Sequence, residues 1–247
     1  WIIGFALMGG AAFMGDSQTL TKAGVQSQVY LQNAAAVMIP FTFVFGVSAW
    51  LMLKSVPVKA NFAQQFDIFR SRHTWSMTSL YVMTFGAFSG LAATFPLLIK
   101  QIYGGFEGAP DPLAWAFYGP LVGSAARVVA GPLSDKLGGA RVTHWAGLGM
   151  LASTVWVTTL TSPTGLDSFP MFVAGMLTMF FFAGVGNAST FKQMPMLFEP
   201  RQAGGVIGFT AAIAAYGPFL FGMLFAASFG AFKSATPVFY GLAAFFA

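Results

Sequence analysis

Long apolar runs, separated by short polar connections, constrain this chain more than any other feature of its sequence. A helix needs about 20 mostly apolar residues to cross the hydrocarbon core of a bilayer. Only 8% of the 247 residues are charged and 56% are hydrophobic, so a water-soluble domain of this composition could not cover its own surface. The sequence therefore predicts an all-α, polytopic membrane protein. We expect helices over residues 1–14 (partial), 32–53, 75–99, 112–131, 142–161, 169–191, 203–228 and 237–247 (partial).

Both ends of the sequence lie inside apolar runs. The chain begins at Trp1 without a methionine and closes on the apolar stretch 241–247, so we expect a fragment whose first and last helices are incomplete. No signal peptide can be read from such a start. The longest polar stretch, residues 54–74, separates the first two expected helices from the other six, and we expect it to link two helical bundles.

The distribution of charge assigns the connections to the two sides of the membrane, because loops rich in Lys and Arg stay cytoplasmic. The connections at 54–74, 132–141 and 192–202 hold eight Lys and Arg residues against three Asp and Glu residues, a net +5. The other connections hold three against four, a net −1. We therefore expect the first group to be cytoplasmic. The basic residues form no stripe with interleaved aromatics, so nucleic acid is not an expected partner.

One charge lies outside these connections, because Arg127 falls in the middle of the expected helix 112–131. A cation at bilayer depth costs at least about 2.5 kcal/mol and usually faces a cavity or pairs with a carboxylate. None of the expected spans contains Asp or Glu. Arg127 should therefore either have a partner outside this chain or bind a mobile anion. Snorkelling to the interface is the alternative, although Arg127 lies several residues from either end of its expected helix.

Small residues surround this arginine on its helix. Gly119, Gly123, Arg127 and Gly131 follow one another at intervals of four residues, which places them on one helical face. Close helix packing explains the glycines by themselves. Packing on either side of Arg127 would also frame a small cavity around the guanidinium.

An aromatic pair lies on the expected helix 75–99. Tyr81 and Phe85 are four residues apart and are followed by Gly86 and Gly90. Such a pair can be core or lipid-facing in a chain with 29 Phe residues. It can also cover the faces of a planar oxyanion held by a planar guanidinium.

A charged, glycine-rich segment at 131–141 resembles a loop of the major facilitator superfamily. The segment GPLSDKLGGAR resembles the pattern G-x-L-x-D-[KR]-x-G-[GR]-x-[RK], which joins the second and third helices of each half of these transporters. The resemblance implies that the chain covers helices 5 (partial) to 12 (partial). Residues 1–53 would end the N-terminal six-helix bundle, 54–74 would be the cytoplasmic linker, and 75–247 would form the C-terminal bundle. The motif residues here are Gly131, Asp135, Lys136, Gly138 and Arg141.

Within that superfamily, the stretches 72–75, 80–88, 119–127 and 183–191 resemble the NarK-type nitrate/nitrite porters. The resemblance implies that Arg127 binds the anion. The residues that it implies as further substrate contacts are Tyr81, Phe85, Asn187, Gly208 and Thr210, and those that it implies as signature or packing positions are Gly119, Gly123, Gly131, Gly184, Gly186 and Gly217.

The glycine-rich stretch 208–217 matches the family's second nitrate signature only in part. Gly208 and Gly217 match its ends, but Ala214 replaces a usual glycine. The hydroxyl of Thr210 stands one residue earlier than expected. These departures leave hydroxyl contact with the anion open.

The resemblance implies a secondary active transporter that moves nitrate, nitrite or both across the bacterial inner membrane by alternating access. Its implied partners are the anion, membrane lipids and an N-terminal half that supplies a second arginine, with no cofactor. The alternatives are a carrier of another small or organic anion and a non-transporting nitrate sensor. The absence of a carboxylate from the expected spans favours exchange over proton symport.

The residues give no indication of an enzyme or a metal centre. Both histidines, His73 and His144, lie at expected helix ends, and the chain has neither an H-x-x-x-H motif nor paired carboxylates. It also contains no cysteine, which excludes disulfides, thiolate metal sites and cysteine nucleophiles from these residues.

Overall fold

The structure, a computed structural model, describes residues 18–22, 25–30, 32–54 and 66–247. The helix expected at 1–14 lies outside these residues. The chain divides into two compact units, residues 1–58 and 59–247. The division falls within the segment expected to be the linker.

The first unit contains a β-hairpin and one helix. Strand β1 (Gln18–Lys22) pairs antiparallel with β2 (Val25–Val29), and Lys22 lies opposite Val25, so two residues connect the strands. From the sequence we expected only a connection between two helices here, because the hydropathy of residues 15–31 is too low for a membrane span. The structure instead pairs two short strands across a two-residue turn. Helix α2 (Gln32–Met52) agrees with the expected helix 32–53.

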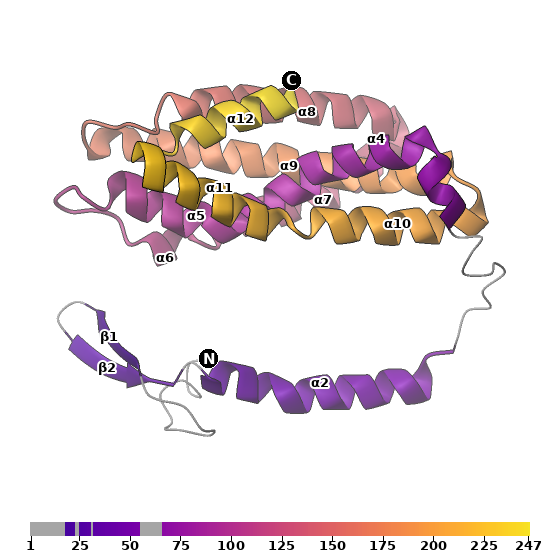
Figure 1. The fold of residues 1–247 in the computed structure, drawn as a ribbon, viewed down its shortest axis with the longest axis horizontal. Helices are drawn as coiled ribbons and strands as arrows, with labels where there is room; N and C mark the ends of the chain where they lie inside the picture. Colours follow the sequence, from indigo (N-terminus) through magenta and orange to yellow (C-terminus); the bar gives the residue numbers. More distant parts are fainter. Residues whose placement is uncertain (1–17, 23–24, 31, 55–65) are drawn as a thin grey trace. The chain divides into compact units, whose positions relative to one another are not determined.

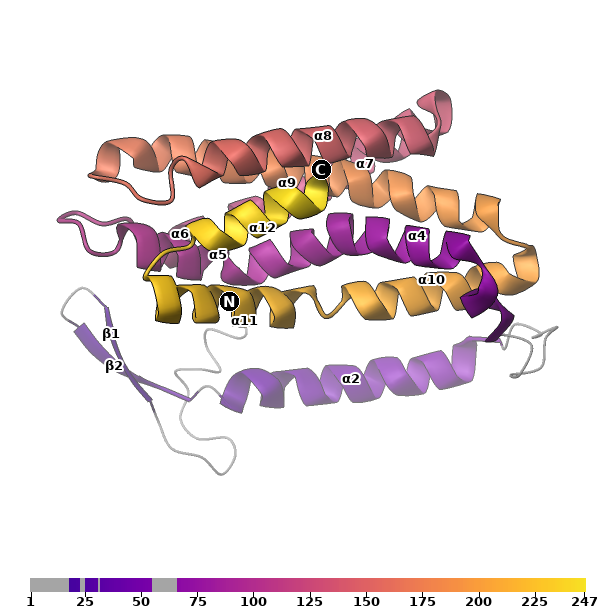
Figure 2. The ribbon, with the colours of Figure 1, turned by 45° about the horizontal axis from the view of Figure 1, so that its top comes forward.

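The second unit is a bundle of long helices, and its six expected helices are all present (Figures 1 and 2). The expected helix 75–99 is built from three consecutive segments. The elements are η1 (Phe66–Arg70), α4 (Arg72–Tyr81), η2 (Val82–Gly86), α5 (Ala87–Tyr103), α6 (Pro112–Trp115), α7 (Tyr118–Leu137), α8 (Gly139–Thr158), η3 (Leu166–Ser168), α9 (Phe169–Leu197), α10 (Pro200–Ala214), α11 (Gly217–Phe232) and α12 (Thr236–Phe246).

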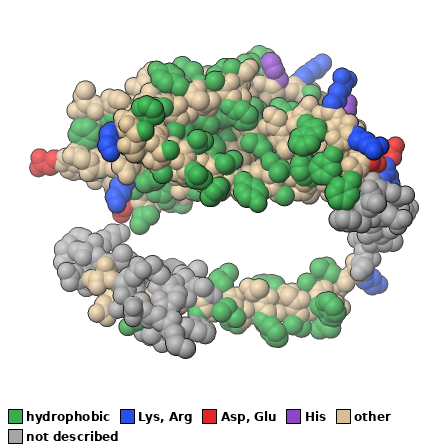
Figure 3. Space-filling view, viewed as in Figure 1, with side chains coloured by type: hydrophobic (Ala, Val, Ile, Leu, Met, Phe, Trp, Pro, Cys, Tyr) green, Lys and Arg blue, Asp and Glu red, His purple; other side chains and the backbone are tan. Residues whose placement is uncertain are grey.

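Four helical stretches of the described chain are long and apolar enough to cross a membrane: Arg72–Tyr103, Pro112–Leu137, Leu166–Leu197 and Pro200–Phe232. Helix α8 has a suitable length, but Arg141 and His144 near its start lower its hydropathy. In the second unit, charged side chains gather towards the two ends of the bundle in Figure 3, whereas hydrophobic and uncharged side chains cover its middle. This distribution is that of a multi-pass membrane protein.

The expected helix 203–228 is broken in the structure. Helix α10 ends at Ala214 and α11 begins at Gly217, so the expected helix is interrupted at residues 215–216, although Pro200–Phe232 remains one candidate membrane span. Pro218 gives the reason, because a proline clashes with the carbonyl four residues before it, which here belongs to Ala214.

The motif at 131–141 is also more helical than expected. Helix α7 continues through Leu137, so Gly131, Asp135 and Lys136 lie on its last two turns rather than in a loop. The chain reverses at Gly138, whose φ of +89° lies in a region that residues with side chains rarely adopt. Helix α8 begins immediately afterwards. The connection is short because one glycine makes the reversal.

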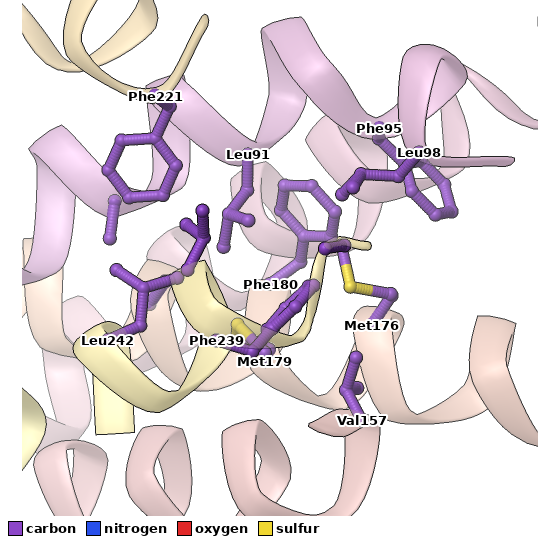
Figure 4. Packing of buried hydrophobic residues seen from close by; sticks show 14 of the residues in the cluster. Leu91, Phe95, Leu98, Val157, Met176, Met179, Phe180, Phe221, Phe239 and Leu242 are labelled. Carbon is purple, nitrogen blue, oxygen red and sulfur yellow. The ribbon is translucent and has the colours of Figure 1, made fainter. Parts of the chain in front are cut away.

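The core of the second unit is aromatic and aliphatic. Helices α5 and α9 contribute its fully buried centre, and α8, α11 and α12 pack around them (Figure 4). A second, smaller cluster joins η1, α4, the end of α9 and α10. The labelled residues of the main core are Leu91, Phe95, Leu98, Val157, Met176, Met179, Phe180, Phe221, Phe239 and Leu242.

Candidate anion site

Helices α7 and α9 approach each other closely along a face of glycines. A Cβ on Gly119 would lie 2.4 Å from the ring of Phe180, and one on Gly123 would lie 2.4 Å from the ring of Phe88. A Cβ on Gly184 would lie 2.2 Å from the carbonyl oxygen of Gly123. A side chain at Gly184 would therefore push the two helices apart, and one at Gly119 or Gly123 would displace a neighbouring phenylalanine ring.

The same contacts place Arg127 and Asn187 at one level. Gly119 meets Phe180 and Gly123 meets Gly184, so residue numbers increase in the same direction along both helices. Arg127 lies four residues beyond Gly123, and Asn187 lies three residues beyond Gly184. One turn of helix past the contact, the two side chains are therefore neighbours across the α7–α9 interface.

A π-helical turn brings the aromatic pair to this level. Element η2 interrupts the α4–α5 helix, and a Cβ on Gly186 of α9 would lie 2.6 Å from Thr84 of η2. Such π-turns inside α-helices are frequent at functional sites. The rings of Tyr81 and Phe85 stack across this turn with their centroids 5.3 Å apart and their planes at 15°.

Tyr81 connects the three helices. Its side chain is buried, and its ring centroid lies 6.0 Å from that of Phe191 on α9. Its hydroxyl lies within interaction range of the Asn187 amide and of the Arg127 guanidinium. The structure thus gathers Tyr81, Phe85, Arg127 and Asn187 in one place, although they are far apart in the sequence.

Arg127 is half-buried and makes no hydrogen bond or ion pair with any residue that the structure describes. Asn187 is only 1% exposed, and both polar atoms of its amide lack a partner within the same residues. The hydroxyl of Thr190, three residues further on, is equally buried and equally unpaired. Thr190 was not among the site residues predicted from the sequence. Its position one helical turn from Asn187 was the available signal.

The structure describes the surroundings of Gly208 and Thr210, two residues that the resemblance implied as substrate contacts. The Thr210 hydroxyl is buried and lies 3.1 Å from the Thr78 hydroxyl, with which it shares a hydrogen bond. Gly208 is exposed, and a Cβ there would meet no described atom within 4 Å. The Thr210 hydroxyl thus joins α4 to α10 through its bond to Thr78.

Gly217 packs the break between α10 and α11 against the π-turn. A Cβ on Gly217 would lie 2.2 Å from the carbonyl oxygen of Gly86. Two irregular segments, η2 and the break after Ala214, are therefore in direct backbone contact.

The motif residues of α7 have a partner on α9. The Lys192 ammonium pairs with the Asp135 carboxylate and donates to the carbonyl oxygen of Gly131 at 3.0 Å. A Cβ on Gly131 would meet no atom within 4 Å among the described residues. Its carbonyl instead helps to join α7 to α9. Lys136 and Arg141 are exposed.

No group of three or more His, Cys, Asp or Glu side chains suited to a metal ion occurs among the residues that the structure describes. The only acidic residues within the four apolar stretches are Asp135 and Asp167, and both lie near a helix end. The longer α7 thus corrects the expectation that no span contains a carboxylate. Neither carboxylate lies at the level of Arg127.

Comparison with known proteins identifies relatives along the whole chain, although no protein-family profile matches it. The chain is 61% identical to the probable nitrate/nitrite antiporter NarK2 of Thermus thermophilus. The match covers all of this chain and 56% of the length of NarK2. It is 31% identical to the nitrate/nitrite transporter NarU of Escherichia coli K12, over 88% of this chain and 50% of NarU.

NarU of Salmonella typhimurium is 34% identical over 70% of this chain and 37% of that protein. The chain therefore spans about half the length, or less, of the curated relatives that it matches. The names of all three relatives describe transporters. The helical architecture and these identities agree: the chain belongs to the NarK-type nitrate/nitrite porter family of the major facilitator superfamily.

Proposed function

We propose that this chain forms the anion-binding C-terminal part of a secondary transporter that exchanges nitrate and nitrite across the bacterial cytoplasmic membrane. In this proposal, residues 75–247 are the C-terminal bundle and 54–74 are the cytoplasmic linker. Residues 1–53 belong to the preceding bundle. The names of the relatives, which include two nitrate/nitrite transporters and a probable antiporter, support this substrate class.

The observation that carries the proposal is the unpaired guanidinium of Arg127 inside a membrane-spanning helix. A cation at this depth is costly unless another charge compensates it. The described part of the chain offers Arg127 no carboxylate and no hydrogen bond. A mobile anion supplies the compensating charge whenever it is bound.

The geometry suits a small planar anion. A guanidinium can donate two parallel hydrogen bonds to two oxygens of nitrate or nitrite. In this proposal the stacked rings of Tyr81 and Phe85 cover one side of the bound anion and keep water away from it. The hydroxyl of Tyr81 and the buried amide of Asn187 add neutral polar groups at the same level.

Anion binding at Arg127 provides the coupling that alternating access requires. Transporters of this kind bind substrate between two bundles that rock about the site. If the other bundle also presents a cation, the empty carrier resists closure, because two positive charges would approach each other in a poorly solvated space. The bound anion removes that repulsion and so favours the closed state.

The proposal is tested by reconstituting the complete reading frame that contains this chain into proteoliposomes. We expect external labelled nitrate to enter rapidly when the vesicles contain nitrate or nitrite, and slowly when they contain neither. If vesicles without internal anion take up nitrate only when an inward proton gradient is applied, the mechanism is proton symport and not exchange. Binding of nitrate without flux under any gradient would indicate a sensor and overturn the proposal.

A further inference from the structure

Two side chains on α9 are buried without a hydrogen bond, which is unusual for polar groups in a packed interior. Leaving one such group unpaired destabilises the folded protein, and most buried polar atoms have a partner. Both amide atoms of Asn187 and the hydroxyl of Thr190 lack one among the described residues. The neighbouring hydroxyl of Ser189 is just as buried but lies 2.7 Å from that of Thr143, with which it bonds. On α9, the buried hydroxyl of Ser189 therefore has a protein partner. The amide of Asn187 and the hydroxyl of Thr190 remain available to bind a ligand or each other.

The unpaired groups lie next to the candidate anion site. The Gly123–Gly184 contact brings Asn187 to the level of Arg127, and the Tyr81 hydroxyl lies within interaction range of both. Thr190 follows Asn187 at i+3, so the two side chains are neighbours on the surface of the helix. Together they place two unpaired, neutral polar side chains near the level of the guanidinium, and we call this pair the polar niche.

The two candidate substrates differ in the number of oxygens that such a niche could bind. Nitrite has two oxygens, and a bidentate guanidinium can bind both. Nitrate has a third oxygen in the same plane, which points away from a guanidinium that binds the other two. A neutral amide N–H can donate to that oxygen without adding another charge to be desolvated.

We propose that Asn187 distinguishes nitrate from nitrite by donating a hydrogen bond from Nδ2 to the third oxygen of nitrate. In this arrangement Thr190 is a positioning residue, whose hydroxyl donates to Oδ1 of Asn187 and so directs Nδ2 towards the anion. Both unpaired groups then gain partners at once. The inference rests on the proposed anion site, and it concerns only the selectivity of that site.

The test compares nitrate and nitrite exchange by Asn187→Leu, Asn187→Ser, Thr190→Val and Thr190→Ser in the complete protein in proteoliposomes. Ser189→Ala is the matched control, because it removes a buried hydroxyl of the same helix that already has a protein partner. Loss of one hydrogen bond to a charged ligand corresponds to about a tenfold or greater loss of affinity.

We expect Asn187→Leu to raise the KM for nitrate about tenfold and to leave that for nitrite within about threefold of the wild-type value. Asn187→Ser, which is less disruptive to folding, should shift the ratio of the two KM values in the same direction. Thr190→Val should shift the ratio of the two KM values in the same direction but by a smaller factor. Thr190→Ser, which keeps the hydroxyl, should keep the wild-type ratio. Ser189→Ala should leave the ratio unchanged.

An equal loss for both anions, or an unchanged ratio in both Asn187 variants, would overturn the inference and leave the anion site intact. A wild-type protein that exchanges neither anion would instead overturn the proposed function. The selectivity ratio separates these outcomes, because a purely structural defect lowers transport of both anions together.

Discussion

A Cβ added to Gly184 would lie 2.2 Å from the carbonyl oxygen of Gly123, so α7 and α9 touch through their backbones at this point. The contact sets the relative depth of the two helices. It therefore determines that Arg127 and Asn187 face the same region. The geometry of the site depends on two residues that carry no functional group.

Gly184→Ala should consequently destabilise the protein. The added methyl group must push α7 and α9 apart, and overpacking of this kind costs about 1–3 kcal/mol. Gly230→Ala is the matched control, because a Cβ at this exposed position of α11 would meet no described atom within 4 Å. Thermal unfolding in detergent, followed by size-exclusion chromatography, should show a lower midpoint for Gly184→Ala only. Equal midpoints would contradict the close contact.

Arg127→Lys should abolish transport almost as completely as Arg127→Ala. A guanidinium donates two parallel hydrogen bonds to the planar anion, whereas an ammonium is a strongly hydrated point charge on a flexible stem. The loss of one charge-assisted hydrogen bond weakens binding by about ten- to a hundredfold. Nitrate and nitrite uptake at matched protein levels measures the effect. Near-normal uptake by Arg127→Lys would refute the role of Arg127 as the anion ligand.

Lys192→Gln is the control for Arg127. Lys192 also lies on a long helix, but it is already paired with Asp135 and with the carbonyl of Gly131. Its replacement should leave the affinity for substrate largely unchanged, and a glutamine can still donate to that carbonyl. A large rise in KM without loss of expression would place Lys192 in the anion path.

The contact between η1 and α10 should depend on pH. The Arg201 guanidinium bonds to Asp67 at 2.6 Å and holds the pKa of that carboxyl below its ordinary value. The pKa of Asp67 is lower in the folded protein than in the unfolded chain, so the ion pair stabilises the folded state fully above the ordinary pKa of about 3.9. This stabilisation is lost as the pH falls through the lowered pKa. Arg201→Gln should bring the pKa of Asp67 back towards the ordinary value, so η1 should loosen at a higher pH.

A spin label can follow this loosening, since the chain has no native cysteine to compete for it. Arg70→Cys provides an exposed attachment point at the end of η1. We expect the label to become mobile at a lower pH with Arg201 present than in the Arg201→Gln variant. Identical profiles in the two proteins would show that the ion pair does not hold η1.

Residues 54–74, 132–141 and 192–202 should be cytoplasmic. A membrane-impermeant maleimide added to intact cells should label Glu107→Cys and should not label Arg72→Cys or Lys136→Cys, all of which replace exposed residues. Ser134 is unsuitable as a probe, although it lies in the motif, because its side chain is buried and donates to the carbonyl of Ala130 at 2.7 Å. Labelling of Lys136→Cys from outside would reverse the proposed topology.

The sequence by itself determined where the apolar helices of residues 66–247 lie, apart from their exact ends, and the unusual place of Arg127. Both follow from hydropathy, because an apolar run is recognisable along the chain whatever its neighbours are. The face that carries Gly119, Gly123 and Arg127 could likewise be predicted, since helical periodicity places residues four apart on one side. The resemblance to NarK-type porters then brought Tyr81, Phe85 and Asn187 into the candidate site.

Only the tertiary structure decided how these helices meet. The π-turn at 82–86 and the break after Ala214 pack against each other through Gly86 and Gly217, and no local periodicity reports a contact between helices so far apart in sequence. The partners of buried hydroxyls were decided in the same way: Thr210 bonds to Thr78, whereas Thr190 has no partner in the described chain. Hydrogen bonding between helices depends on their relative rotation and depth, which residue type alone does not specify.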